Sequence, residues 1–233
     1  MAPTDYIERK HRLEAYFDRT AAENWRRLTS DAPVGRVRAT VRAGRDEMRE
    51  GLLAWLPTIM DGTRLLDAGC GTGALAQIVA ARGGHVVAAD VSPTLIDIAR
   101  ERIPSIDHER VTFHVGDMLD DSLGEFDYVV AMDSMIHYGC EHLVNMLASY
   151  APRTRRAIIF TFAPRTVALS IMHRVGRLIP NLQHRAPAIE PIAERRLREA
   201  IRHEPALKDW RIDDINPVSR GFYTSTGMRL VRS

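Results

Sequence analysis

The sequence predicts an α/β fold whose sheet of seven strands is mostly parallel, and two observations support it. From Thr63 onward, apolar runs of strand length alternate with amphipathic segments of helix length. The chain has 233 residues, 45% of them hydrophobic, which is enough for one core with an added segment. Such alternation places helices on both faces of a parallel sheet, and ligands bind at the carboxyl ends of its strands.

The N-terminal quarter of the chain is predicted to be helical. Apolar residues recur there at roughly helical spacing among charges: Tyr6, Leu13, Phe17, Trp25 and Leu28. The Ala-Pro-Val-Gly stretch at 32–35 breaks the pattern, and a second amphipathic stretch runs over 36–56 and ends at Pro57. We therefore divide the chain into an N-terminal helical cap (1–56) and a main domain (57–233).

The main domain supplies the predicted sheet. Its strands are expected at Arg64–Asp67, Val86–Ala89, Val111–Val115, Tyr128–Ala131 and Ala157–Phe162, with helices at 73–82, 93–102 and 139–150. Residues 210–215 and 218–231 are expected to give the last strands, with Gly221 and Gly227 at turns or bulges. The segment 164–205 interrupts the alternation. It is predicted to be a helical insertion that covers the active site together with 1–56.

A glycine loop follows the first predicted strand. Gly69, Gly71 and Gly73 stand where a nucleotide-like ligand must lie against the backbone and a Cβ would clash. Nicotinamide-binding proteins carry similar loops, and Ala74 completes their G-x-G-x-x-A form. Asp67 favours S-adenosylmethionine (SAM) instead, because a carboxylate attracts its amino group and repels a pyrophosphate.

Two further acids follow predicted strands. Asp90 can accept both ribose hydroxyls of the ligand, while Ser92-Pro93 is the better candidate for the next helix cap. Asp117 can accept the adenine amino group, with Met118 packed on the ring. Val91 and Met132 complete the predicted cofactor-binding residues. These features in this order resemble the Rossmann-like class of SAM-dependent methyltransferases, over about residues 60–162.

Residues 133–138 follow the fourth predicted strand, at the edge of the expected methyl-transfer site. The stretch lacks the D/N-P-P-aromatic motif of DNA amino-methyltransferases, and Lys+Arg 32 nearly balances Asp+Glu 30, so no nucleic-acid partner is expected. His137 can act as a general base or as a donor that positions a carboxylate, or it can be structural.

Here the chain resembles the magnesium-protoporphyrin IX O-methyltransferase family of bacteriochlorophyll and chlorophyll synthesis. The resemblance rests on Tyr16-Phe17 with Trp25-Arg26-Arg27, on MDSMIHY at 132–138, on FTFAPRT at 160–166 and on GFYTS at 221–225. The family's Thr-Gly-Phe-x-Arg-Trp-Arg-Arg-Ile-Tyr pattern is altered here: Ala21-Ala22-Glu23-Asn24 follow Thr20. The purple-bacterial type therefore fits better than the cyanobacterial and plant type.

The resemblance implies SAM-dependent methylation of one propionate of magnesium-protoporphyrin IX, giving the monomethyl ester. It implies catalytic roles for His137 and Tyr16, and substrate contacts from Tyr138, Arg165, Arg174 and Arg177. The magnesium belongs to the substrate, and no protein-bound metal is expected because the histidines are not paired with acids at ligand spacing. Handover from the porphyrin-binding subunit of magnesium chelatase is a further expectation from the family.

The composition of the chain indicates the cellular compartment of the protein. The two cysteines, Cys70 and Cys140, lie far apart, and the sequence has neither a signal-peptide core nor an apolar run of about 20 residues. A cytoplasmic protein is expected. Residues 151–211 carry thirteen Arg or Lys and five Asp or Glu, an excess of eight. This is either a solvated face or a surface for an anionic substrate or for peripheral contact with the inner (photosynthetic) membrane.

Three alternative functions remain open from the residues alone. The first is another small-molecule methyltransferase that acts on a carboxyl or phenol oxygen. The second is a nicotinamide-dependent oxidoreductase, and the third is a SAM-binding protein with a regulatory role.

Overall fold

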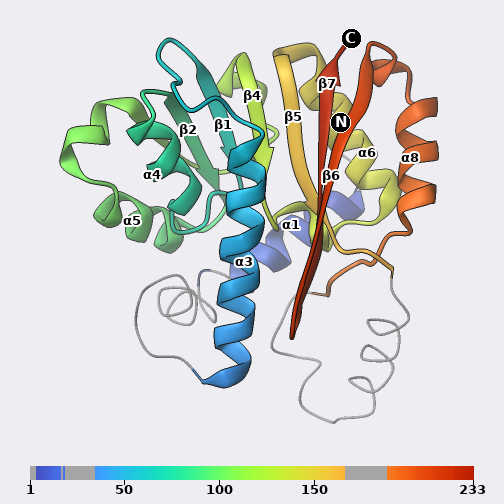
Figure 1. Ribbon diagram of the computed structural model, residues 1–233, viewed down its shortest axis with the longest axis horizontal. Coiled ribbons are helices and arrows are strands. Elements are labelled where there is room, and N and C mark those ends of the chain that lie inside the picture. The colour runs from blue at the N-terminus through green and yellow to red at the C-terminus, as the bar shows by residue number, and fades with distance from the viewer. Residues whose placement is uncertain (1–3, 17, 19–34, 166–187) are drawn as a thin grey trace.

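The computed structural model describes residues 4–16, 18, 35–165 and 188–233. It contains a seven-stranded sheet in the order β3-β2-β1-β4-β5-β7-β6 (Figure 1). The strands are β1 (Arg64–Ala68), β2 (His85–Asp90), β3 (Val111–Val115), β4 (Phe126–Ala131), β5 (Thr154–Phe162), β6 (Trp210–Arg220) and β7 (Tyr223–Arg232). The first five pair in parallel, and β7 pairs antiparallel with both β5 and β6. The predicted α/β class and the seven-stranded, mostly parallel sheet are confirmed.

Helices cover both faces of this sheet. They are α1 (Thr4–Tyr16), α3 (Arg36–Ala54), α4 (Ala74–Ala81), α5 (Pro93–Arg102), α6 (Cys140–Tyr150) and α8 (Glu194–His203). Residues from α3, α4 and α5 share one buried apolar cluster, and residues from α1, α6 and α8 share the other. The sheet separates these two clusters because successive side chains of each strand point to opposite faces.

Local sequence explains where several elements begin. The side chain of Ser92 accepts a hydrogen bond from the amide of Leu95 at 3.2 Å, and Pro93 occupies the first turn of α5. This is the predicted cap, and it satisfies an amide that the helix start would otherwise leave unpaired. In β1, Leu65 and Leu66 are fully buried, as expected for a central parallel strand with helices on both sides.

Short 3₁₀ segments also connect these elements. They lie at Ser105–Arg110, Asp121–Leu123, Met135–His137, Ala151–Arg153 and Pro205–Leu207. The one at Met135–His137 follows β4 directly, so it holds the predicted catalytic histidine at the strand's carboxyl end.

The C-terminal hairpin differs from the prediction in its boundaries. We expected a break between 215 and 218, but Pro217 lies inside β6. Because β6 is at the edge of the sheet, a residue without an N–H group is tolerated there. The turn falls instead at Gly221, whose φ is +56°, so that glycine is at a turn as predicted.

Gly227 is neither a turn nor a bulge, as we had expected, but a regular residue of β7. It pairs with Thr161 of β5 and with Asn216 of β6. A Cβ at this position would come within 2.8 Å of the Leu52 side chain on α3. Glycine therefore allows α3 to lie close across the sheet.

Both segments that were predicted to cover the active site are described only in part. In the N-terminal segment, α3 buries Met48, Leu52 and Leu53 in the core and packs against β6 and β7. In the 164–205 segment, α8 packs against α6 and buries Leu197 and Ile201 (Figure 1). The amphipathic stretch Val167–Leu178 lies outside the described residues. The covering role and the cap boundary at residue 56 stay predictions.

Candidate active site

A pocket of about 1160 Å³, including its open mouth, lies at the carboxyl ends of β1, β2 and β4. Its wall comes from α1, from α3, from the loop between β1 and α4, and from the residues that follow β2, β3 and β4. The carboxyl edge of a parallel sheet is where this fold class binds ligands.

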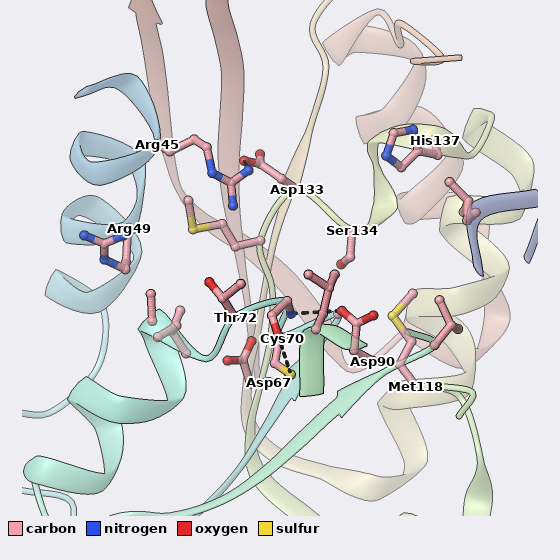
Figure 2. Close-up of a pocket in the computed structure, with 18 of the residues that line it drawn as sticks. Arg45, Arg49, Asp67, Cys70, Thr72, Asp90, Met118, Asp133, Ser134 and His137 are labelled. Carbon is pink, nitrogen blue, oxygen red and sulfur yellow. Dashed lines mark hydrogen bonds and ion pairs between the residues drawn. The ribbon is translucent and has the colours of Figure 1, made fainter. Parts of the chain in front are cut away.

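The glycine loop forms the floor of this pocket (Figure 2). Gly69, Gly71 and Gly73 have φ values of +79°, +54° and +77°, in the left-handed region that favours glycine. A Cβ on Gly69 would also lie 2.3 Å from the Cβ of Ser134. Backbone conformation therefore favours glycine at all three positions, and close packing requires it at Gly69. The close approach of a ligand to this backbone stays a prediction.

Asp67 lies beneath the loop with only 2% of its surface exposed. Its Oδ2 atom is buried and has no hydrogen-bond partner. The pKa of Asp67 is raised to about 7, mainly by burial. The hydrogen bond from the Ala76 amide lowers this pKa, and the nearby Asp90 raises it. A buried carboxyl with an unused oxygen fits a ligand that brings a cationic donor to this point.

Asp90 is at the end of β2 and also lines the pocket. Its two oxygens accept hydrogen bonds from the amides of Gly71 at 2.9 Å and Ser92 at 3.0 Å. Burial raises the pKa of Asp90, and these amide bonds lower it. These bonds fix the orientation of the carboxylate, and Val91 lines the pocket beside it.

Asp117 and Met118 line the pocket beyond β3, as predicted. The carboxylate of Asp117 accepts from the Tyr6 hydroxyl at 2.8 Å, from the Lys10 ammonium at 3.0 Å and from the Leu119 amide at 2.9 Å. Tyr6 and Lys10 belong to α1. The sequence did not reveal this contact because it joins positions more than 100 residues apart.

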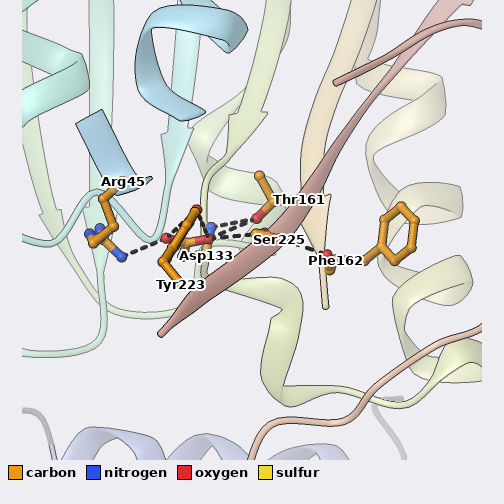
Figure 3. A network of polar contacts seen from close by, with 6 residues as sticks. All are labelled: Arg45, Asp133, Thr161, Phe162, Tyr223 and Ser225. Atoms are coloured by element: carbon orange, nitrogen blue, oxygen red, sulfur yellow. Dashed lines mark hydrogen bonds and ion pairs between the residues drawn. The ribbon is translucent and has the colours of Figure 1, made fainter. Parts of the chain in front are cut away.

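Met132 lines the pocket as predicted. Its neighbour Asp133 also lines the pocket, although it was not among the predicted site residues. Asp133 adopts a φ of +56°, which is uncommon for a residue with a Cβ. Its carboxylate bonds to Arg45 at 2.6 Å and to the Tyr223 hydroxyl at 3.0 Å (Figure 3). The Thr161 hydroxyl accepts a hydrogen bond from the Asp133 amide at 2.7 Å.

These contacts join α3, β4, β5 and β7 at one point, with the Asp133 side chain only 5% exposed. The ring of Tyr223 also packs against Gly44, where a Cβ would come within 2.5 Å of it. An acid directly after a strand, inside the MDSMIHY stretch, was the available signal. The partners are distant in sequence, so the cluster itself could not be predicted.

His137 lines the same pocket and is 8% exposed. Its Nδ1 atom lies 3.2 Å from the backbone oxygen of Ala188. Burial lowers the pKa of His137, so the ring is neutral at pH 7. A carbonyl oxygen can only accept, which assigns the proton to Nδ1 and makes Nε2 the basic atom of the ring.

Residues of α1 contact His137 and its neighbours and hold them in place. The guanidinium of Arg9 donates to the backbone oxygen of His137 and pairs with Glu190 at 3.0 Å. Tyr138 lines the pocket and stacks on Tyr6 with ring centroids 5.5 Å apart. Burial raises the pKa of Tyr138, so its hydroxyl stays protonated.

Not all predicted residues meet here. Tyr16 is half-buried at the end of α1 and Arg165 is exposed; neither is among the residues that line the pocket. Arg174 and Arg177 lie outside the described residues. The arginines that do line the pocket are Arg42, Arg45 and Arg49 of α3. Their spacing of three and four residues along one predicted helix places them on one face, and this was the available signal.

Among the residues that the structure describes, no group of three or more His, Cys, Asp or Glu side chains could hold a metal ion. Among the same residues, no helix is long and apolar enough to cross a membrane.

Known proteins share both sequence and fold with this chain. Residues 131–232 match the family described as magnesium-protoporphyrin IX methyltransferase C-terminus, and residues 65–156 match the methyltransferase domain family. Magnesium-protoporphyrin O-methyltransferase of Rhodobacter capsulatus is 47% identical over 226 residues, 96% of each chain. The Synechocystis protein of the same name is 29% identical over 178 residues, 75% of this chain and 77% of that protein.

The solved structures agree with these matches. The crystal structure of magnesium protoporphyrin IX methyltransferase from Synechocystis with bound SAH superposes with a TM-score of 0.83 at 27% identity. It covers 96% of this chain and 100% of that one. The same protein with bound SAM gives a TM-score of 0.76 at 25% identity, covering 97% of each chain.

Proposed function

The chain belongs to the magnesium-protoporphyrin IX methyltransferase family, and on that premise we propose that it methylates one propionate of magnesium-protoporphyrin IX. The product is the monomethyl ester, and SAM is the methyl donor. The observation that carries the proposal is the 47% identity to the Rhodobacter capsulatus enzyme over 96% of both chains. The pocket is consistent with it, because a glycine loop and buried acids line one side and His137 the other.

The residues around the glycine loop fit the donor. SAM supplies an electrophilic methyl group on a sulfonium, which a carboxylate oxygen can take up directly. Asp90 would hold the ribose hydroxyls, because its oxygens are already oriented by the amides of Gly71 and Ser92. Asp117 and Met118 would hold the adenine, and Val91 and Met132 would line the nucleoside.

His137 is proposed as the catalytic residue on the acceptor side. A propionate that enters a buried pocket loses solvation, which favours its protonated and unreactive form. The basic Nε2 atom of His137 would take that proton and keep the oxygen available. Tyr16 stays the second proposed catalytic residue. Burial raises the pKa of its phenol, so its hydroxyl would act as a hydrogen-bond donor and not as a base.

Contacts with the substrate are also proposed. Tyr138 would pack against the apolar macrocycle. Arg165, Arg174 and Arg177 remain the proposed partners of the propionates, and the pocket adds Arg42 of α3 as a candidate. Guanidinium groups suit this task because they bind carboxylates with two parallel hydrogen bonds.

The cellular location of the protein and the delivery of its substrate are also proposed. We expect a cytoplasmic protein that touches the inner photosynthetic membrane and receives its substrate from the porphyrin-binding subunit of magnesium chelatase. Val37 and Phe222 are 52% and 59% exposed, and Arg36 and Arg38 are exposed beside Val37. Binding to vesicles of anionic lipid that is unaffected by Phe222→Ser would contradict the membrane contact at this surface.

The deciding experiment incubates the protein with SAM and magnesium-protoporphyrin IX and measures the monomethyl ester by chromatography. Absence of ester would reject the substrate. Transfer to a simple phenol or carboxylic acid under the same conditions would favour the alternative methyltransferase. Binding of NADH without binding of SAM would favour an oxidoreductase.

His137→Ala tests the proposed catalytic residue in the same assay. We expect turnover to fall about 100-fold, the lower range for loss of a general base, while the dissociation constant for SAM stays nearly unchanged. His142→Ala is the control, since His142 is on α6 and does not line the pocket. Loss of SAM binding in His137→Ala would instead place His137 in the donor site.

A further inference from the structure

Residues outside the pocket hold His137 from two sides. Arg9 of α1 contacts its backbone, and the stretch 188–190 contacts both its ring and the residue before it. Neither Arg9 nor Glu190 lines the pocket. Any influence of these two residues on a bound ligand therefore passes through His137 and its neighbours.

The stretch 188–190 lies alongside the 3₁₀ segment Met135–His137. The amide of Glu190 donates to the backbone oxygen of Ile136 at 2.9 Å. Two residues earlier, the backbone oxygen of Ala188 lies 3.2 Å from Nδ1 of His137. The partner of one ring nitrogen decides which nitrogen carries the proton, so this carbonyl selects the form with the proton on Nδ1 and a basic Nε2.

One guanidinium nitrogen ties these two segments together. Nη1 of Arg9 donates to the backbone oxygen of His137 and pairs with Oε1 of Glu190 at 3.0 Å. A single side chain therefore contacts both His137 and the segment that carries the acceptor for its ring. In Figure 2, His137 lies close to the blue ribbon of α1.

The helix α1 presents Arg9 from a fixed position. The Tyr6 hydroxyl donates to Asp117 at 2.8 Å, and its ring stacks on Tyr138. Lys10 pairs with the carboxylate of Asp117 at 3.0 Å. The helix is thus anchored three residues before Arg9 and one residue after it.

The ion pair between Arg9 and Glu190 is partly open to solvent. The two side chains are 22% and 42% exposed. Pairs of this kind contribute little to the free energy of unfolding. Stability of the whole fold therefore accounts poorly for the pair, and variants of either residue should fold.

We propose that Arg9 and Glu190 are positioning residues for methyl transfer. Their ion pair fixes the stretch 188–190 against His137, so that the Ala188 carbonyl keeps the ring proton on Nδ1 and Nε2 stays the basic atom. The inference rests on the proposed function, because it takes His137 as the base.

Two charged groups act on the ring from different elements, Arg9 from α1 and Asp133 after β4. Burial lowers the pKa of His137, the Ala188 contact and Asp133 raise it, and Arg9 lowers it. The Tyr138 hydroxyl stays protonated, since burial raises its pKa. Asp133 and Tyr138 are unchanged in every variant below. A change of charge at Arg9 should therefore appear in the titration of the ring.

Nuclear magnetic resonance of the protein with isotope-labelled histidine tests the proposal. The nitrogen shifts report which ring atom is protonated, a pH titration reports the midpoint for His137, and His137→Ala assigns the signal. In the wild type the proton should be on Nδ1. Arg9→Gln should move the midpoint upward, because a cation beside the ring is lost. It should also populate the form with the proton on Nε2.

Three further variants separate charge from structure. Glu190→Gln removes the anion that offsets Arg9, so it should move the midpoint downward. Arg9→Lys keeps the charge, and its midpoint should stay near that of the wild type. Arg12→Gln removes an exposed arginine of the same helix that does not line the pocket, and it should match the wild type in every measurement.

The methyl-transfer assay gives a second readout. Arg9→Gln should lower turnover about 10-fold, a part of the loss expected for the base itself, with the dissociation constant for SAM nearly unchanged. Absence of ester from the wild type would reject the proposed substrate. The resonance measurements would then still decide whether the pair positions the ring.

Three outcomes would overturn the proposal. In the first, the wild-type ring carries its proton on Nε2. In the second, Arg9→Gln leaves both the protonated atom and the midpoint unchanged. In the third, Arg9→Gln and Glu190→Gln move the midpoint in the same direction, as a purely structural role of the pair would.

Discussion

The carboxyl ends of β1 and β2 form one half of the pocket, and the residues that follow β4 form the other half together with α3. Each half has a buried acid at its centre. In the first half, Asp67 has an oxygen without a partner and a pKa raised by burial. In the second, Asp133 accepts from Arg45, Tyr223 and Ser225 and is fully engaged.

This difference indicates different tasks. A buried acid that lacks a partner destabilises the free protein and gains from a cationic ligand. A buried acid with several partners holds its surroundings in place whether or not a ligand is present. Under the proposed function, the donor completes the first half of the pocket, whereas the second half is formed in advance.

The largest expected effect tests the unsatisfied half. The pKa of Asp67 is about 7 in the folded protein and near 4 in a model peptide. Its protonated form is favoured by folding, so the folded protein loses stability as pH rises from about 4 to 7. Asp67→Asn does not titrate. At pH 8 it should be more stable than the wild type, by an upper limit on the order of 4 kcal/mol.

Urea unfolding of the wild type and Asp67→Asn at pH 5 and pH 8 measures this gain. The neighbours that face Asp67 are Asp90, the neutral thiol of Cys70 and the amide of Ala76, and all are unchanged in the variant. A gain that is equal at both pH values would show that Asp67 is not the titrating group.

The second prediction tests the satisfied half. Asp133→Ala removes the carboxylate from Arg45 and Tyr223 and leaves a partly buried guanidinium without its 2.6 Å partner. We expect a loss of about 3 kcal/mol in the free energy of unfolding. Asp133→Asn keeps an acceptor and tolerates the positive φ, so it should lose less. Equal losses in the two variants would mean that the charge is unimportant.

The third prediction separates the two halves by function. Asp90→Ala removes the acceptor of the Gly71 amide and the proposed ribose contact. The dissociation constant for SAM should rise about 10- to 100-fold, the range for a lost charge-assisted hydrogen bond, with smaller change in turnover at saturation. This is the reverse of the pattern expected for His137→Ala. The same pattern in both variants would contradict the division into halves.

The smallest effect concerns α1, which reaches both halves. Tyr6→Phe removes the 2.8 Å hydrogen bond to Asp117 but keeps the stacking on Tyr138. The cost in unfolding free energy should be about 1–2 kcal/mol. SAM affinity should rise or stay the same, because one competitor for Asp117 is removed. A fall in affinity would show that the Tyr6 hydroxyl is part of the donor site.

Local sequence determined the donor half of the site. Gly69, Gly71 and Gly73 with Asp67 lie within seven consecutive residues, and Asp90 ends the next strand. Strand periodicity and left-handed glycine positions are properties of short segments, so they can be recognised without the fold. For the same reason the first five strands, the helices between them and the Ser92 cap were predicted correctly.

Only the tertiary structure decided the acceptor half. Asp133 meets Tyr223 across 90 residues and Arg45 across 88. The α1 contacts to Asp117, the proposed adenine partner, likewise span more than 100 residues. Such long-range contacts depend on the order of strands in the sheet and on the packing of α3 across β7 at Gly227. The sequence therefore identified which ligand class the floor of the pocket suits. The fold decided which arginines face that pocket, because side-chain direction on α3 is set by what the helix packs against.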